Sequence, residues 1–144
     1  MADKLSLEVV TPFRTVLNED VDSVTLPGIE GEMGILPEHV PLLTTLDAGI
    51  MSYVNGNGKT QAIAVHWGYA QVDGNNVRVL AELAETANEI DLPRAQKAEK
   101  NAKELLQSEK QPTSSDWEDE ESRQEVYENK LQRSVVRQAV ANFQ

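Results

Sequence analysis

Apolar and polar residues alternate along the first half of the chain, which is the pattern of strands that bury one face. Leu5, Leu7 and Val9 show the alternation first. The stretches Asn55–Gly58 and Asp73–Asn76 contain residues that tolerate the positive φ angles of tight hairpins. Short strands at this close spacing predict an antiparallel β-sandwich or flattened barrel over residues 1–84. The other β-rich runs behind this prediction are Val16–Leu17, Val24–Leu26, Ile50–Val54, Ala62–Val65 and Val77–Leu80.

The period of the pattern changes near Ala84, from every second residue to every third or fourth. Asp91 has the side chain of a helix cap, and Pro93 is tolerated in the first helical turn. We therefore expect a helix over about residues 91–107. One face of this helix is expected to carry residues spaced by three, four and three positions: Ala95, Ala98, Ala102 and Leu105.

A second helix is expected over about residues 116–142, after a loop that contains Pro112. Ser115 and Glu118 have the spacing of a capping box at its start. Acidic residues crowd the beginning of this segment and basic residues follow later, which is the order that the helix dipole favours. Its apolar side is expected to hold Tyr127, Leu131, Val135 and Phe143.

The chain is thus predicted to be an α+β protein, in which the sandwich is followed by an antiparallel hairpin of two helices over residues 85–144. Two helices that meet along an alanine-rich seam bury little surface. We therefore expect the hairpin to dock weakly on the sandwich and to be able to move away from it.

The 144 residues carry a formal net charge of −11 and include no cysteine. Because an acidic surface repels phosphate backbones, free nucleic acid is not expected as a partner. The absence of cysteine excludes disulfides and thiolate metal sites.

The first residues, Met1–Lys4, lead directly into the strand pattern, so we expect no signal peptide. No apolar run approaches the roughly 20 residues of a transmembrane helix. Any link to a membrane is therefore expected to run through a partner.

Glycine and proline residues recur in the stretch Pro27–Pro37. Together with His39 and Pro41, this stretch resembles the signature of the epsilon subunit of rotary ATP synthases. The resemblance runs in register over about residues 5–107. Glu38 departs from it, because the family commonly has glycine at this place, and the turn is expected to differ there. Further matching stretches are Val9–Pro12, Trp67–Val72, Val77–Glu82 and Ile90–Ala95.

This resemblance implies a non-catalytic subunit of the central stalk in a bacterial proton-transporting ATP synthase, with no enzymatic activity of its own. It implies that the sandwich binds the gamma subunit and the membrane-embedded c-ring, and so couples proton-driven rotation to ATP synthesis. It also implies that the C-terminal helices open, reach the alpha and beta subunits and inhibit ATP hydrolysis. The chain is accordingly expected as a peripheral protein at the cytoplasmic face of the bacterial inner membrane. The residues expected to contact the c-ring are Glu30, Glu32 and His39.

The stretch Ile90–Ala95 also resembles the motif with which some bacterial epsilon subunits bind ATP. Arg133 and Arg137 share one face of the second helix, where guanidinium groups can meet a triphosphate. The alternative is that Asp91 only caps a helix while the other side chains are solvated or bridge the hairpin. Asn101 favours this alternative, because nucleotide-binding relatives tend to carry arginine in its place. The residues expected to bind ATP as a regulatory ligand are Glu85, Ile90, Asp91, Arg94, Ala95, Arg133 and Arg137.

Lys130, Arg133 and Arg137 are also candidates for inhibitory contacts with acidic residues of the alpha and beta subunits, although the same charges suit an ordinary helix end. No cofactor is required by this reading. His39 and His66 are the two histidines of the chain and lie far apart in the sequence, so we predict no metal site. His66 falls within a strand pattern and is expected to be structural.

A free-standing β-sandwich that binds other proteins and carries a helical tail is the alternative class of function. It explains the periodicities equally well, but it does not explain the combined glycine-proline signature and helix-start motif. An enzyme is disfavoured, because the glycine-rich stretch lacks the Lys-Ser or Lys-Thr pair of a phosphate-binding loop and no serine lies in a nucleophile elbow.

Overall fold

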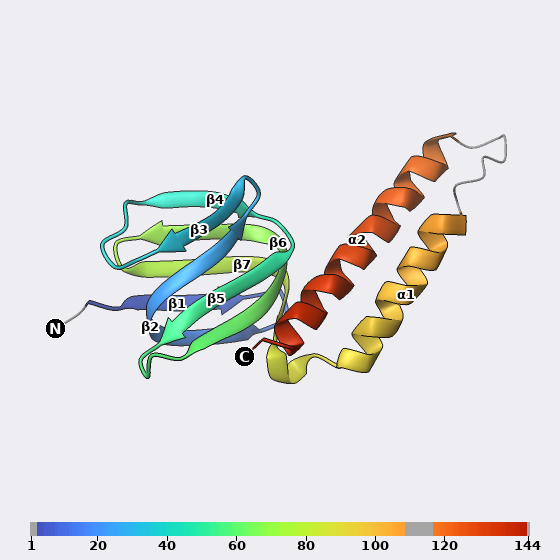
Figure 1. Cartoon of the computed structure of the whole chain (residues 1–144). Coiled ribbons are helices and arrows are strands. Elements are labelled where there is room, and N and C mark those ends of the chain that lie inside the picture. The colour runs from blue at the N-terminus through green and yellow to red at the C-terminus, as the bar shows by residue number, and fades with distance from the viewer. Residues whose placement is uncertain (1–2, 109–116, 144) are drawn as a thin grey trace.

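The computed structural model describes residues 3–108 and 117–143. Figure 1 shows two parts, a β-sandwich formed by the N-terminal half and a helical hairpin that extends from one side of it. Strands come first and helices second, so the predicted α+β fold class is confirmed. The predicted capping residue Ser115 lies outside the described residues.

Seven strands make up the sheet in the described part of the chain. Leu5, Leu7 and Val9 are fully buried and the residues between them are half-buried, as the alternation predicts. The glycine- and proline-rich stretch and the residues after it also form strands, β3 and β4, which the sequence pattern did not resolve. The strands are β1 (Leu5–Val10), β2 (Thr15–Gly28), β3 (Gly31–Ile35), β4 (Leu42–Leu46), β5 (Gly49–Asn55), β6 (Thr60–Asp73) and β7 (Asn76–Thr86).

The sheet closes on itself because β1 pairs with both β2 and β7. The strand order is β1-β7-β6-β4-β2-β3, and β5 pairs with β2 and β6. The described pairings are antiparallel except for β1 and β7, which run parallel. This one pair departs from the antiparallel sandwich that we expected. The two strands are separated by nearly the whole domain, so no short hairpin forces them to run in opposite directions.

β6 changes neighbours along its length, from β5 to β4. At the change Trp67 has a φ of 47° and Gly68 a φ of 153°. A left-handed φ is rare for a bulky residue such as tryptophan. A Cβ atom on Gly68 would lie 2.0 Å from the carbonyl oxygen of Leu80. The bend therefore requires glycine at position 68, and it leaves the Trp67 ring on the side of the sandwich that faces the helices.

An aliphatic core fills the space between the two layers of the sandwich. Because the side chains of a close-packed core interlock, the domain is stiff. Its largest fully buried members include Leu5, Leu7, Leu26, Ile35, Leu46, Met51 and Ile63.

Two helices, α1 (Leu92–Ser108) and α2 (Trp117–Ala141), follow a short 3₁₀ helix, η1 (Ala87–Glu89). They lie side by side as an antiparallel hairpin, and α2 is the helix that contacts the sandwich, at β5, β6 and β7 (Figure 1). β7 continues to Thr86, so the change of period falls two residues later than Ala84, where we expected it. Glu85 consequently belongs to the sheet and not to the hairpin.

The buried faces of the helices differ in part from the predicted ones. On α1, Ala95 and Ala102 are buried as expected, but Ala98 is exposed. On α2, Val135 is exposed, whereas Ser134 and Val140 are buried. The difference on α2 arises because this helix packs against α1 on one side and against the sandwich on another. A helix with two neighbours buries two stripes of side chains, and a single apolar face does not describe it.

Candidate functional site

The outer face of the sandwich beneath α2 is lined by small residues. Ala62 and Ala64 of β6 are buried there, and together with Val140 of α2 they form a cluster separate from the main core. Partly buried aliphatic residues, Ile50 and Val136 among them, pack around this cluster. Because alanine side chains are short, the helix approaches the strands closely over a small apolar area. This contact alone gives the hairpin a limited hold on the sandwich.

A bidentate ion pair crosses the same contact. Arg137 donates from Nε and Nη2 to the two carboxylate oxygens of Glu85, and both distances are 2.7 Å. Glu85 is held in β7 opposite Ala64, and only 9% of its surface is exposed. A guanidinium that matches both oxygens of a partly buried carboxylate forms one of the stronger polar contacts in proteins. The pair therefore fixes the position of α2 along β7.

Arg133 lies one helical turn before Arg137 and reaches Trp67. Its guanidinium carbon is 5.7 Å from the centroid of the indole ring, which is the geometry of a cation–π contact. Its Nε atom is buried and has no hydrogen-bond partner among the described residues. The backbone strain at Trp67 therefore occurs at the contact between the two parts of the molecule. Strained residues of this kind concentrate at functional and switching sites.

His66 lies beneath this contact on the same outward side of β6 as Ala64. Its side chain is fully buried, and neither ring nitrogen has a hydrogen-bond partner in the described part of the chain. Burial lowers the pKa of the imidazole to about 4, and the positive charges of Arg133 and Arg137 act in the same direction while Glu85 opposes them. The imidazole is therefore neutral near pH 7 as long as α2 covers it.

The linker between sheet and helices is held by its own set of bonds. Arg14, in the loop between β1 and β2, forms an ion pair of 2.7 Å with Glu89 and donates to the carbonyl oxygen of Ala84. The carboxylate of Glu89 also accepts from the backbone N–H of Thr86. These bonds tie η1 to the sandwich, so the linker remains attached to the sheet as far as Glu89.

The ATP-binding set predicted from the sequence is only partly brought together. Asp91 accepts a hydrogen bond from the backbone N–H of Arg94, so its predicted role as a helix cap is confirmed, and the Arg94 side chain is exposed. Ile90 packs on the small apolar cluster and Ala95 is buried. Glu85 takes both donating groups of Arg137 that face it. ATP binding stays a prediction.

The part that His66 and Trp67 play in this contact was not predicted from the sequence. The alternation along β6 places His66 on the face opposite to the core, and that was a usable signal. The left-handed conformation of Trp67 left no trace in the composition of the segment, apart from the glycine that follows it.

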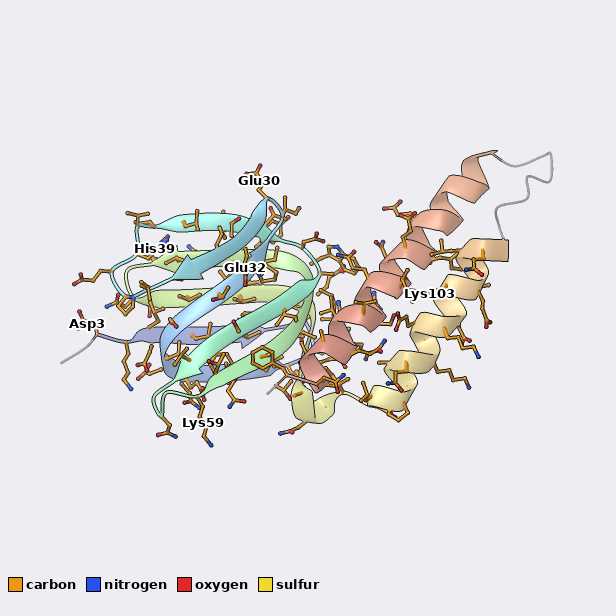
Figure 2. All side chains as sticks on the ribbon, in the orientation of Figure 1. Asp3, Glu30, Glu32, His39, Lys59 and Lys103 are labelled. Atoms are coloured by element: carbon orange, nitrogen blue, oxygen red, sulfur yellow. The ribbon has the colours of Figure 1, made fainter. Side chains whose placement is uncertain are left out.

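Of the residues predicted to contact the c-ring, Glu32 lies in β3, Glu30 in the turn before it and His39 in the loop after it (Figure 2). Glu30 and Glu32 are exposed and border a shallow concavity of about 420 Å³ between β3 and β4. His39 lies in the loop after β3, where its Nδ1 is 2.7 Å from the carbonyl oxygen of Val40. Glu38 has a φ of 65°, so the turn keeps a left-handed residue although it lacks the glycine common at this place. The structure thus groups the two glutamates and places His39 beyond the other end of the strand.

The described residues contain no group of three or more metal-ligating side chains. Neither of their helices combines the length and the apolar character that crossing a membrane requires.

Comparison with known proteins identifies the sandwich and extends to the helices. The family model of the beta-sandwich domain of the ATP synthase delta/epsilon chain matches residues 4–87. The ATP synthase epsilon chain of Carboxydothermus hydrogenoformans is 57% identical over 106 residues, which are 74% of this chain and 78% of that protein. The epsilon chain of Geotalea uraniireducens is 44% identical over 141 residues, which are 98% of this chain and 96% of that protein.

Solved structures show the same fold at low sequence identity. A chain of the mitochondrial ATP synthase of Euglena gracilis matches with a TM-score of 0.77 and 23% identity, over 94% of this chain and 80% of that one. A chain from the central stalk and c-ring of the Tetrahymena thermophila mitochondrial enzyme matches with a TM-score of 0.59 and 14% identity, over 94% of this chain and 98% of that one. The alternative of a β-sandwich unrelated to ATP synthase is therefore no longer supported. With residues 4–87 matched by the family model and almost the whole chain aligned with a relative, this protein belongs to the ATP synthase epsilon chain family.

Proposed function

We propose that this chain is a rotor component of a rotary ATP synthase, in which a stiff sandwich transmits rotation and a detachable hairpin regulates ATP hydrolysis. The observation that carries this proposal is the way in which the two parts meet. A small alanine-lined contact and one bidentate ion pair hold α2 on a domain that has its own complete core. Such a contact is sufficient to dock a helix and weak enough to release it.

The sandwich is proposed to bind the gamma subunit through an exposed apolar stripe. Tyr69 of β6 and Leu80 of β7 face each other across the strands, and both are about half exposed. Leu43 of β4, which pairs with Gln71 of β6, is exposed on the same layer. Exposed apolar patches on an otherwise charged protein mark surfaces that other proteins cover. Because the domain is stiff, torque applied at this stripe reaches the opposite end of the sandwich with little deformation.

The ring-facing surface is proposed to lie at Glu30 and Glu32, which border the concavity between β3 and β4. Exposed carboxylates at the rim of a concavity can pair with basic residues in the loops of a c-ring. Through gamma and the ring the chain is held peripherally at the cytoplasmic face of the bacterial inner membrane.

Replacing Glu32 by lysine is expected to weaken association with the c-ring. A reversed charge turns an attraction of roughly 1 kcal/mol into a repulsion of similar size, so affinity should fall about tenfold or more. Binding of the purified chain to membranes stripped of this subunit measures the effect. Asp20→Lys is the matched control, since Asp20 is also exposed but lies on β2 opposite Ser6, away from the concavity and from the apolar stripe. Equal binding of both variants would contradict the assignment of this surface.

The hairpin is proposed to inhibit ATP hydrolysis when it leaves the sandwich and reaches the alpha and beta subunits. Lys130 is exposed in the docked arrangement, with its ammonium group 5.8 Å from the Tyr127 ring. Arg133 and Arg137 face the sandwich and are occupied there by Trp67 and Glu85. Release of α2 would make both guanidinium groups available to acidic residues of the catalytic subunits. The docked hairpin thus keeps part of its inhibitory charge covered.

Deleting the chain from Pro112 onward is expected to raise ATP hydrolysis severalfold, because the truncated chain lacks α2 and with it Lys130, Arg133 and Arg137. The measurement is the hydrolysis rate of the complex reconstituted with the full or the truncated chain. Deletion of Gln144 alone serves as the control for an altered C-terminus. An unchanged rate, with the truncated chain still bound to the complex, would refute an inhibitory role of the hairpin.

A further inference from the structure

His66 is the one titratable side chain of β6 that the docked hairpin covers completely. It lies on the outward side of the strand beside Ala64 and Ala62, which α2 covers. Its imidazole is fully buried, and both ring nitrogens lack hydrogen-bond partners among the described residues. A polar group that is buried without a partner costs free energy, and that cost is removed when water reaches it. Docking of α2 therefore carries the free-energy cost of burying the His66 imidazole without hydrogen-bond partners.

The charged groups around His66 make this conflict depend on protonation. β7 contributes Glu85, and α2 contributes Arg133 and Arg137. Both oxygens of Glu85 already accept hydrogen bonds from Arg137, so an imidazolium at position 66 would have to share this carboxylate with a guanidinium. The partly buried residue that β5 adds to the contact, Ile50, is apolar. A proton on His66 would thus stand beside two arginines and a carboxylate that is already paired.

We propose that His66 is a proton-linked latch, in which protonation of its imidazole favours release of the helical hairpin from the sandwich. The inference rests on the proposed function, because it requires that the hairpin can leave the sandwich. It adds a regulator to that function: acidification of the surrounding solution favours the released and inhibitory arrangement.

The direction and range of the effect follow from the two states of the residue. In the docked state the pKa of His66 is lowered to about 4. In the released state the exposed imidazole returns to an ordinary pKa of about 6.5. The docked state therefore keeps its full stability above about pH 6.5 and loses it progressively as the pH falls toward 4. Between pH 7.5 and 5.5 the ratio of released to docked molecules should rise roughly tenfold.

Thiol modification of the full chain detects the release even when few molecules are open. The native chain has no cysteine, so a single introduced cysteine is the only thiol that the reagent can modify. Ala64→Cys places a thiol beneath α2, whereas Asn57→Cys places one in an exposed turn and corrects for the intrinsic reactivity at each pH. Val65→Cys points into the sandwich core and reports unfolding of the sandwich itself.

The expected result is a roughly tenfold rise of the corrected Ala64→Cys rate between pH 7.5 and 5.5, with no such rise for Val65→Cys. His66→Leu removes the titrating group at similar volume and should abolish the rise, and His66→Gln should do the same if the leucine variant does not fold. His39→Gln, which changes the only other histidine of the chain, should leave the rise intact.

Two results would overturn the latch while leaving the proposed function in place. One is a corrected rate that exceeds the Val65→Cys rate at every pH but does not change with pH. The other is a pH-dependent rise that persists in the His66→Leu and His66→Gln variants. If Ala64→Cys reacted no faster than Val65→Cys at any pH, the hairpin would not leave the sandwich, and the latch and the regulatory part of the proposed function would both fail.

Discussion

Alanine at position 68 is expected to prevent the sandwich from folding stably. The new Cβ atom would lie 2.0 Å from the carbonyl oxygen of Leu80 and 2.8 Å from the Cα atom of Ala81. Both are backbone atoms of β7, so no flexible side chain can yield. The φ of 153° adds strain of its own, because a residue with a side chain rarely adopts it. Together these effects should lower the free energy of unfolding by at least about 3 kcal/mol. Urea unfolding of the purified Gly68→Ala variant measures this loss.

Gly34→Ala is the matched control for this experiment. A Cβ atom on Gly34 would meet no atom within 4 Å, and its φ does not lie in the left-handed region. We therefore expect its free energy of unfolding to stay within about 1 kcal/mol of the native value. If Gly68→Ala proved as stable as Gly34→Ala, the requirement of the β6 bend for glycine at position 68 would be contradicted.

Arg137→Met should release the hairpin while leaving the sandwich folded. The variant keeps a long apolar side chain but removes both hydrogen bonds to Glu85, which then remains as a nearly buried carboxylate without its partner. Breaking a partly buried ion pair on one side costs about 2–3 kcal/mol after allowance for the 27% exposure of the arginine side chain. The released fraction should rise roughly 30- to 150-fold.

The thiol at position 64 also measures this release, at a fixed pH of 7.5. Lys103→Met is the matched control, because Lys103 forms an ion pair of 2.8 Å with Glu99 within α1, and more than half of its side chain is exposed. Exposed pairs of this kind contribute little, so the control should modify at the native rate. A native rate for Arg137→Met would mean that the apolar contact alone decides docking.

The fold class was predictable from the sequence because the two parts of the chain have different periods of hydrophobicity. Leu5, Leu7 and Val9 needed only their alternation to be placed in a core. The parallel pairing of β1 with β7 was not predictable, since a period of two shows which face of a strand is buried and not which strand lies next to it. The same limit explains why β3 and β4 were missed in a stretch rich in glycine and proline.

The candidate site was predictable in its residues more than in its arrangement. Arg133 and Arg137 were identified from their four-residue spacing, and Glu85 from its place in a family motif. Their meeting depends on the register between β6 and β7 and on which side of α2 faces the sheet, which are tertiary properties. Val135 is an example: it was expected to be buried but is exposed. A helix that packs against two neighbours has no single apolar face, so its buried residues cannot be predicted from one stripe.

The clamp formed by Arg14 and Glu89 determines where a moving hairpin would turn. Since η1 stays tied to the sheet, the pivot falls at Ile90 and Asp91, between that clamp and the first turn of α1. The 17 residues of α1 then act as a lever arm about 25 Å long. The displacement of the far end of the arm is the product of this length and the angle of rotation at the two backbone positions. A short hinge near the rim of the sandwich thus determines how far α2 can be displaced from the sandwich.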